Sequence, residues 1–125
     1  MSSPAEMAGG RFQFMWALQA LAQPAEVQFG LFPSFACVGD ELALDYGNWT
    51  RWYQAHHSVT AAQADCLREL ALVLAEIRGD AWLDTGLRSL AIWDEVRAKA
   101  AQTLVAFGWK AEMPPSGRSL YARGG

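Results

Sequence analysis

The amino-acid sequence predicts a mostly α-helical protein, folded as a single domain with a compact bundle of about four helices. Three observations support this prediction. Apolar residues recur every three or four positions over residues 60–78 and 87–107, and glycine follows each of these segments. A chain of 125 residues can bury one sizeable core. No internal repeat or shift in composition marks a second domain.

Residues 1–10 are mostly small and polar, so we expect a flexible leader before the domain. Residues 11–22 (RFQFMWALQALA) favour a helix with apolar side chains on nearly every side, which predicts a central core helix or one that packs on two sides. The same helix is a candidate homodimer interface. The run also imitates a secretory signal ending at Ala20-Leu21-Ala22, but Gln13 and Gln19 interrupt it and argue against that interpretation.

Residues 24–38 (PAEVQFGLFPSFACV) leave two interpretations open. Pro24 suits the start of a short helix, because its missing N–H needs no partner there. Alternatively, residues 27–32 and 34–38 form two short extended pieces separated by Pro33. In either case the apolar side chains of this segment belong to the core.

Residues 39–57 hold both histidines and two of the six tryptophans. As one helix at about 100° per residue, they form two neighbouring stripes. The first stripe should face the core and consists of Leu42, Tyr46, Trp49 and Tyr53. The second is acidic with an aromatic end, and we expect it to be an exposed binding surface formed by Glu41, Asp45, Asn48 and Trp52. Alternatively, Gly47 ends a first helix, which would turn Trp52 away from Asp45.

Residues 60–78 give the strongest helical pattern. Thr60 and Gln63 match a capping box, and one face is apolar: Cys66, Leu67, Leu70, Val73, Leu74 and Ile77. Residues 87–107 should form one further helix with an apolar face of Ile92, Trp93, Val96, Ala100, Thr103, Leu104 and Phe107. Residues 110–125 contain Pro-Pro, Ser-Gly and Gly-Gly, which are typical of an extended or disordered tail. The helical domain should therefore span residues 11–109.

The distribution of charge indicates the kind of partner. The formal net charge is −3, which argues against a nucleic-acid-binding role. Over residues 24–84, nine carboxylates against three arginines leave a formal charge of −6, and the remainder of the chain is basic in balance. Such a segment attracts a partner protein with a basic surface. No stretch approaches the roughly 18 apolar residues needed to cross a membrane.

No pattern of catalytic or metal-binding residues is present. Cys37 and Cys66 fit no zinc spacing, and reduced thiols suit a cytoplasmic location. His56 and His57 are adjacent, so on a helix their side chains point about 100° apart and do not form a joint metal site. We therefore expect a protein with no catalytic residue, no metal and no cofactor. The alternative is a small enzyme or ligand-binding protein with a pocket between residues 24–38 and 39–57.

Three short motifs carry a resemblance: Leu31-Phe-Pro33, the run from Asp40 to Asp45 (DELALD), and Trp49. Together they resemble small uncharacterised proteins encoded in GC-rich bacterial genomes. Some acidic bacterial proteins of this type are immunity proteins, which neutralise a toxin. The resemblance implies a non-enzymatic, immunity-type or antitoxin-type binding protein whose acidic, aromatic-edged surface blocks a basic site on a toxin. A self-associating structural subunit is a further alternative.

Overall fold

The computed structural model describes residues 4–115, and it describes the side chains of residues 9–115. Among these residues there are α-helices, one 3₁₀ turn and connecting loops, and no strand. The predicted mostly α-helical fold class is therefore confirmed. The elements in chain order are α1 (Pro4–Ala22), α2 (Ala25–Gly30), α3 (Val38–His56), α4 (Ala61–Glu76), the 3₁₀ turn η1 (Gly79–Trp82), α5 (Asp84–Ser89) and α6 (Ala91–Phe107).

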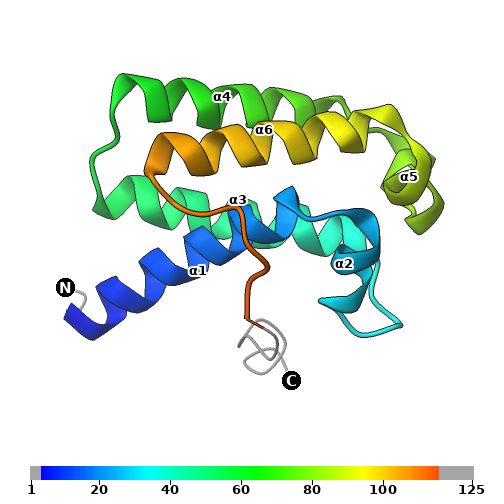
Figure 1. The fold of residues 1–125 in the computed structure, drawn as a ribbon, viewed down its shortest axis with the longest axis horizontal. Coiled ribbons are helices and arrows are strands. Elements are labelled where there is room, and N and C mark those ends of the chain that lie inside the picture. The colour runs from blue at the N-terminus through cyan, green and yellow to red at the C-terminus, as the bar shows by residue number, and fades with distance from the viewer. Residues whose placement is uncertain (1–3, 116–125) are drawn as a thin grey trace.

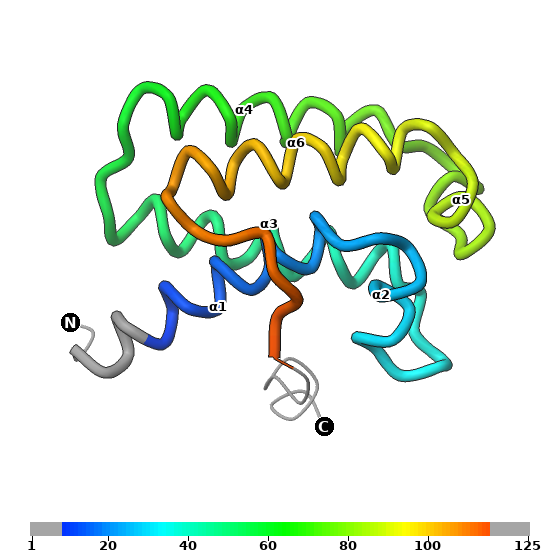
Figure 2. Tube along the Cα trace, in the orientation of Figure 1, coloured from blue at the N-terminus to red at the C-terminus, as the bar shows by residue number. Residues whose placement is uncertain are grey.

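The four long helices form the body of the fold (Figure 1). α4 packs against α6, α6 against α1, and α1 against α3, so the helices follow one another around the core in that order. α3 and α4 are joined by residues 57–60 but have few contacts along their lengths. The tube in Figure 2 shows the same course, with α2 and α5 at one end. The bundle is thus closed by packing on three sides and open between α3 and α4.

Helix α1 begins at Pro4, so the expectation of a flexible leader is wrong for residues 4–10. Residues 1–3 lie outside the described residues. The apolar character of α1 on nearly every side has a structural reason. α3 and α6 contact it on two sides, and the segment after α6 crosses in front of it (Figure 1). Gln19 is buried under that segment and donates a 2.9 Å hydrogen bond from Nε2 to the Lys110 carbonyl oxygen.

The segment over residues 24–38 follows the helical interpretation in its first half. Pro24 is the N-cap of α2, and residues 31–37 form turns, so the expected extended pieces near residues 27–38 are absent from the described chain. The short helix turns the Gln28 side chain back onto the end of α1. Residues 110–115 have no regular secondary structure, and the remainder of the predicted tail, residues 116–125, lies outside the described residues.

Helix α4 confirms the capping box. Thr60 Oγ1 accepts a hydrogen bond from the Gln63 backbone N–H (3.1 Å), and Gln63 Oε1 accepts one from the Thr60 N–H (2.9 Å). The predicted apolar face is also correct, because Leu67, Leu70, Val73 and Ile77 are buried. Leu74 lies at the edge of this face and is only half-buried.

The predicted single helix over residues 87–107 is wrong, because the chain forms α5 and α6 with a break at Leu90. Leu90 has an extended backbone (φ −87°, ψ 137°). The break lets α5 turn aside so that Leu87 is fully buried, which a continuous helix in the direction of α6 would not provide. The predicted face holds for α6 itself, where the buried residues are Trp93, Val96, Ala100, Thr103 and Leu104.

Aromatic rings join three of the long helices. The ring of Phe14 on α1 stacks on Tyr53 of α3 at 4.6 Å and meets Phe107 of α6 edge-on at 5.5 Å. Trp109 stacks on Phe107 at 4.8 Å and so covers this end of the core. Aromatic pairs at such distances contribute about 0.5–1.5 kcal/mol beyond the burial of their area.

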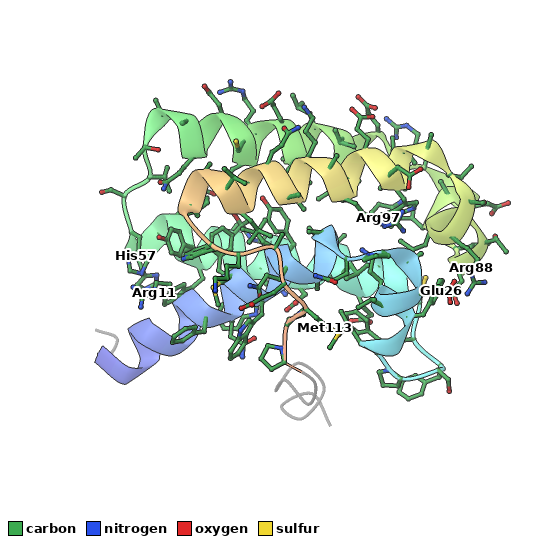
Figure 3. All side chains as sticks on the ribbon, in the orientation of Figure 1. Arg11, Glu26, His57, Arg88, Arg97 and Met113 are labelled. Carbon is green, nitrogen blue, oxygen red and sulfur yellow. The ribbon has the colours of Figure 1, made fainter. Side chains whose placement is uncertain are left out.

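A buried polar cluster fixes the opposite end. Gln28 is fully buried and donates from Nε2 to the carbonyl oxygens of Ala20 and Leu21, both at 3.1 Å. Its Oε1 accepts from Arg97 at 3.0 Å, and Arg97 also donates to the Leu87 carbonyl oxygen at 2.6 Å. Figure 3 shows Arg97 where α6, α5 and α2 meet. Burial lowers the pKa of Arg97, and the nearby Asp94 opposes that shift.

We expect Arg97→Met to lower the free energy of unfolding by about 2–3 kcal/mol, because it leaves the buried Gln28 Oε1 without its donor. Arg88→Met is the matched control, since Arg88 pairs with Glu26 at 3.0 Å on the surface (Figure 3). An exposed pair of this kind contributes only about 0–1 kcal/mol. Urea denaturation of both variants measures the difference. Equal losses would show that the buried cluster has no special role.

Candidate functional site

Helix α3 is continuous from Val38 to His56, so Gly47 lies in its interior and does not end it. The two stripes predicted from the sequence therefore share one helical frame. The core-facing stripe is confirmed: Leu42 and Tyr46 are buried, and Trp49 and Tyr53 are half-buried and packed against the core.

The second stripe differs from its prediction at one central residue. Asp45 is only 3% exposed, so the expectation that it lies on an open surface is wrong. At about 100° per residue, Asp45 is only about 60° from Leu42 around the helix, and that flank of α3 faces α1. Of the other predicted binding residues, Asn48 is exposed, and Glu41 and Trp52 are half-buried. The structure thus brings Glu41 and Asn48 to the outward side of α3 but leaves Asp45 inside.

Trp52 has a packing role within the chain. Its indole ring lies against Gly10 of α1 so closely that a Cβ atom at Gly10 would overlap it. The ring also stacks on His56 at 4.5 Å, and His57 stacks on Tyr53 at 4.5 Å. The two histidines therefore extend the aromatic packing at the end of α3. Among the described residues, no group of three or more histidine, cysteine or acidic side chains is placed to hold a metal ion.

An open groove of about 440 Å³ lies between α3 and α4. Its α4 wall is formed by Ala71, Leu74 and Ala75, and its α3 wall by Ala43, Leu44, Tyr46, Gly47, Thr50 and Arg51, with Asn48 at the edge. Leu44 is 60% exposed. Sequence reasoning missed this surface, although an outward leucine beside alanine and glycine was a readable signal. Asn48 is the one predicted binding residue that lines the groove.

Two hydroxyl groups in the groove wall are unusual. The oxygens of Tyr46 and Thr50 are buried and have only each other as hydrogen-bond partners, so one of the two O–H donors has no acceptor within the described part of the chain. The two residues lie one helical turn apart. Burial raises the pKa of the Tyr46 hydroxyl from 10.0 to about 12, and the nearby Thr50 hydroxyl limits the rise. A buried polar group without a partner costs about 1–3 kcal/mol, so this wall of the groove is held at the expense of stability.

A second hollowed region lies beside the loop that follows α2. One hollow of about 410 Å³ is lined by residues 34–37 and 83–85, and an adjoining hollow of about 280 Å³ extends to Phe29 and Arg88. Residues 24–38 therefore line hollows, as the ligand-binding alternative expects, but the opposite wall comes from α5 and not from residues 39–57. Cys37 lies here with its thiol 3.6 Å from the Trp82 carbonyl oxygen, and burial raises its pKa. Cys37 and Cys66 are both free thiols.

Comparisons of the chain with protein-family models, curated proteins and solved structures gave no match. None of the helices over residues 4–115 has the combined length and apolar character that a bilayer crossing requires.

Gly47→Ala should raise the free energy of unfolding by about 1 kcal/mol, because alanine is favoured over glycine in a helix interior. No atom lies within 4 Å of the added methyl group. Gly10→Ala makes the same chemical change in α1 but should destabilise the protein, since the new methyl group displaces the Trp52 ring. Thermal unfolding of both variants measures the two signs. A lower melting temperature for Gly47→Ala would contradict the open space beside Gly47.

The burial of the Tyr46 hydroxyl should make the stability of the protein depend on pH in the alkaline range. The pKa of this hydroxyl is raised to about 12 in the folded chain, so between pH 10 and 12 the folded state keeps a proton that the unfolded state releases. Stability therefore falls as the pH rises through this window, by about 2–3 kcal/mol in total. In Tyr46→Phe this contribution is absent. Between pH 9 and pH 11.5, urea denaturation should show a smaller loss of unfolding free energy for Tyr46→Phe than for the unchanged protein. Identical losses would contradict the raised pKa of Tyr46.

Proposed function

We propose that this protein is a non-enzymatic protein-binding module of the immunity type, which neutralises a toxin by covering a basic site on it. The observation that carries the proposal is the outward side of α3, where Leu44 and Asn48 line the open apolar groove beside α4 and Glu41 lies one helical turn before them. An exposed leucine next to an apolar depression is the kind of surface that anchors a partner protein.

Charge supports a basic partner. Most carboxylates of the acidic segment over residues 24–84 are exposed, and those next to the outward side of α3 are Asp40 and the half-buried Glu41. Exposed charges of one sign accelerate encounter with an oppositely charged surface. In this proposal Asp45 does not contact the toxin, because its side chain is buried within the chain. Trp52 contributes its accessible edge while its ring packs on Gly10.

The hollows beside residues 34–37 support a second candidate, a small enzyme or ligand-binding protein. They gather Cys37, Asp84 and the hydroxyl groups of Ser34 and Thr85 around one depression. Titration with metabolite mixtures, followed by NMR of the amides of residues 34–37, tests this candidate.

Self-association through residues 11–22 is favoured by one observation. Phe12 is 43% exposed and stacks on the half-buried Trp16 at 5.8 Å, whereas Ala17, Leu18 and Leu21 are buried within the chain. Only the first half of the helix is thus free for a homodimer contact. Sedimentation of the purified protein, with Phe12→Ser as the variant, tests this candidate.

Immunity genes commonly adjoin the gene of their toxin, so the product of the neighbouring gene is the first partner to test. We expect its production to arrest growth of a bacterial host and co-expression of this protein to restore growth. Glu41→Gln should slow association with that partner roughly two- to threefold at low salt, with a smaller effect at high salt.

Glu112→Gln is the control for charge. It removes the same unit of charge from an exposed position in the segment that follows α6 and crosses α1 (Figure 1). Stopped-flow association at two ionic strengths compares the variants. Equal effects of the two substitutions would refute the placement on α3, and failure to restore growth with any neighbouring gene product would refute the immunity role.

A further inference from the structure

We infer that the groove between α3 and α4 receives one amphipathic α-helix of the partner protein, with a small aliphatic face, a central hydrogen-bonding side chain, an acidic first turn and a basic last turn. This inference rests on the proposed function and names the part of the partner that the module recognises. Three independent features of the groove lead to it.

The first feature is the close approach that the walls permit. Ala43, Gly47, Ala71 and Ala75 present no bulky side chain, and the space next to the Gly47 Cα is open. Helices pack with their axes about 8–10 Å apart, and the shorter distances require small residues at the contact. Nothing inside the chain requires glycine at position 47, because α3 is regular there. A helix from another protein that lies on this position would require it.

The second feature is the pair of buried hydroxyl groups. Tyr46 is 3% exposed and lines the groove, and its oxygen and that of Thr50 have no hydrogen-bond partner but each other among the described residues, which leaves one O–H donor without an acceptor. An apolar occupant would leave that donor without an acceptor in a still drier environment. An occupant with an amide or hydroxyl side chain at the centre of its buried face would supply the acceptor. The groove therefore selects for one polar residue within an aliphatic face.

The third feature is the charge at the two ends. Arg51 lines one end and donates to the neutral Asn48 Oδ1 at 2.8 Å, and no carboxylate of the described chain pairs with it. Asp40 is exposed one turn before Ala43 and Leu44, on the same side of α3. Arg51 and Asp40 are about 16 Å apart along the helix. They match an acidic first turn and a basic last turn, the arrangement that also stabilises a helix through its dipole. The partner helix thus runs antiparallel to α3.

A synthetic 14-residue peptide provides the probe. It has leucine and alanine on one face, a central glutamine, two glutamates at its start, two lysines at its end and one hydrocarbon link between positions i and i+4. We expect saturable one-to-one binding to the full chain in fluorescence polarisation, with the largest amide shifts in NMR at Gly47 and Ala71. A linked peptide with the charges exchanged should bind at least tenfold more weakly, and one with leucine for glutamine about fivefold more weakly.

Variants of the protein locate the site. Gly47→Leu fills the groove and should abolish binding of the peptide, while Gly9→Leu adds the same side chain to α1 at an equally open glycine and should leave binding unchanged. Tyr46→Phe should weaken binding about fivefold without lowering the melting temperature, since the free protein loses one buried hydroxyl of a pair whose hydrogen bonds are incomplete. A role of Tyr46 in folding alone would not give this combination.

The inference is overturned by full binding to Gly47→Leu, by amide shifts confined to other surfaces, or by no binding at all. The inference is also overturned if other residues of the same chain, or a second copy of the chain, occupy the groove. A chain that ends at residue 115 and binds the peptide more than tenfold better, or a concentration-dependent dimer lost in Gly47→Leu, would show this. If the toxin partner binds Gly47→Leu normally, only the groove inference fails. If peptide binding holds but no toxin is neutralised, the proposed function fails.

Discussion

The hydrogen bonds of Gln28 determine how the rest of the molecule is arranged. A glutamine amide in an apolar interior is costly unless each of its groups is bonded. Here Nε2 donates to the carbonyl oxygens of Ala20 and Leu21 near the end of α1, and Oε1 accepts from the guanidinium of Arg97 on α6. Arg97 in turn holds the carbonyl oxygen of Leu87 at the break between α5 and α6. One buried side chain therefore fixes the end of α1 relative to α6 and sets the position of α5.

The placement of α1 explains why the bundle is open between α3 and α4. α1 lies between α3 and α6, and the aromatic rings of Phe14, Tyr53 and Phe107 join these three helices at its other half. Among the long helices, α4 packs mainly against α6. The gap is consequently a product of the core packing, and α3 exposes Leu44 and Gly47 to it because neither is needed inside.

The sequence contains enough local information for most of the helices and for one stripe of α3. The Thr60 capping box and the spacing of Leu67, Leu70 and Val73 are local signals, and the structure follows them. The break at Leu90 was not readable, since it depends on Arg97 and the burial of Leu87, contacts between separate elements. Asp45 was misplaced for a similar reason: a position 60° from the core stripe is buried or exposed according to which neighbour lies beside it. The groove was missed because it belongs to two helices at once.

The features of α3 that cost stability lie on one side of the helix. Gly47 weakens the helix interior, and the hydroxyl groups of Tyr46 and Thr50 are buried with no partner outside the pair. Alanine, phenylalanine and valine at these positions would each remove a cost and would fit the free chain. Departures from local consistency that gather at one place are typical of functional surfaces, because selection keeps there what folding alone would discard. All three residues face the groove, so the costs have a common explanation in an occupant that uses the open space and the two hydroxyl groups together.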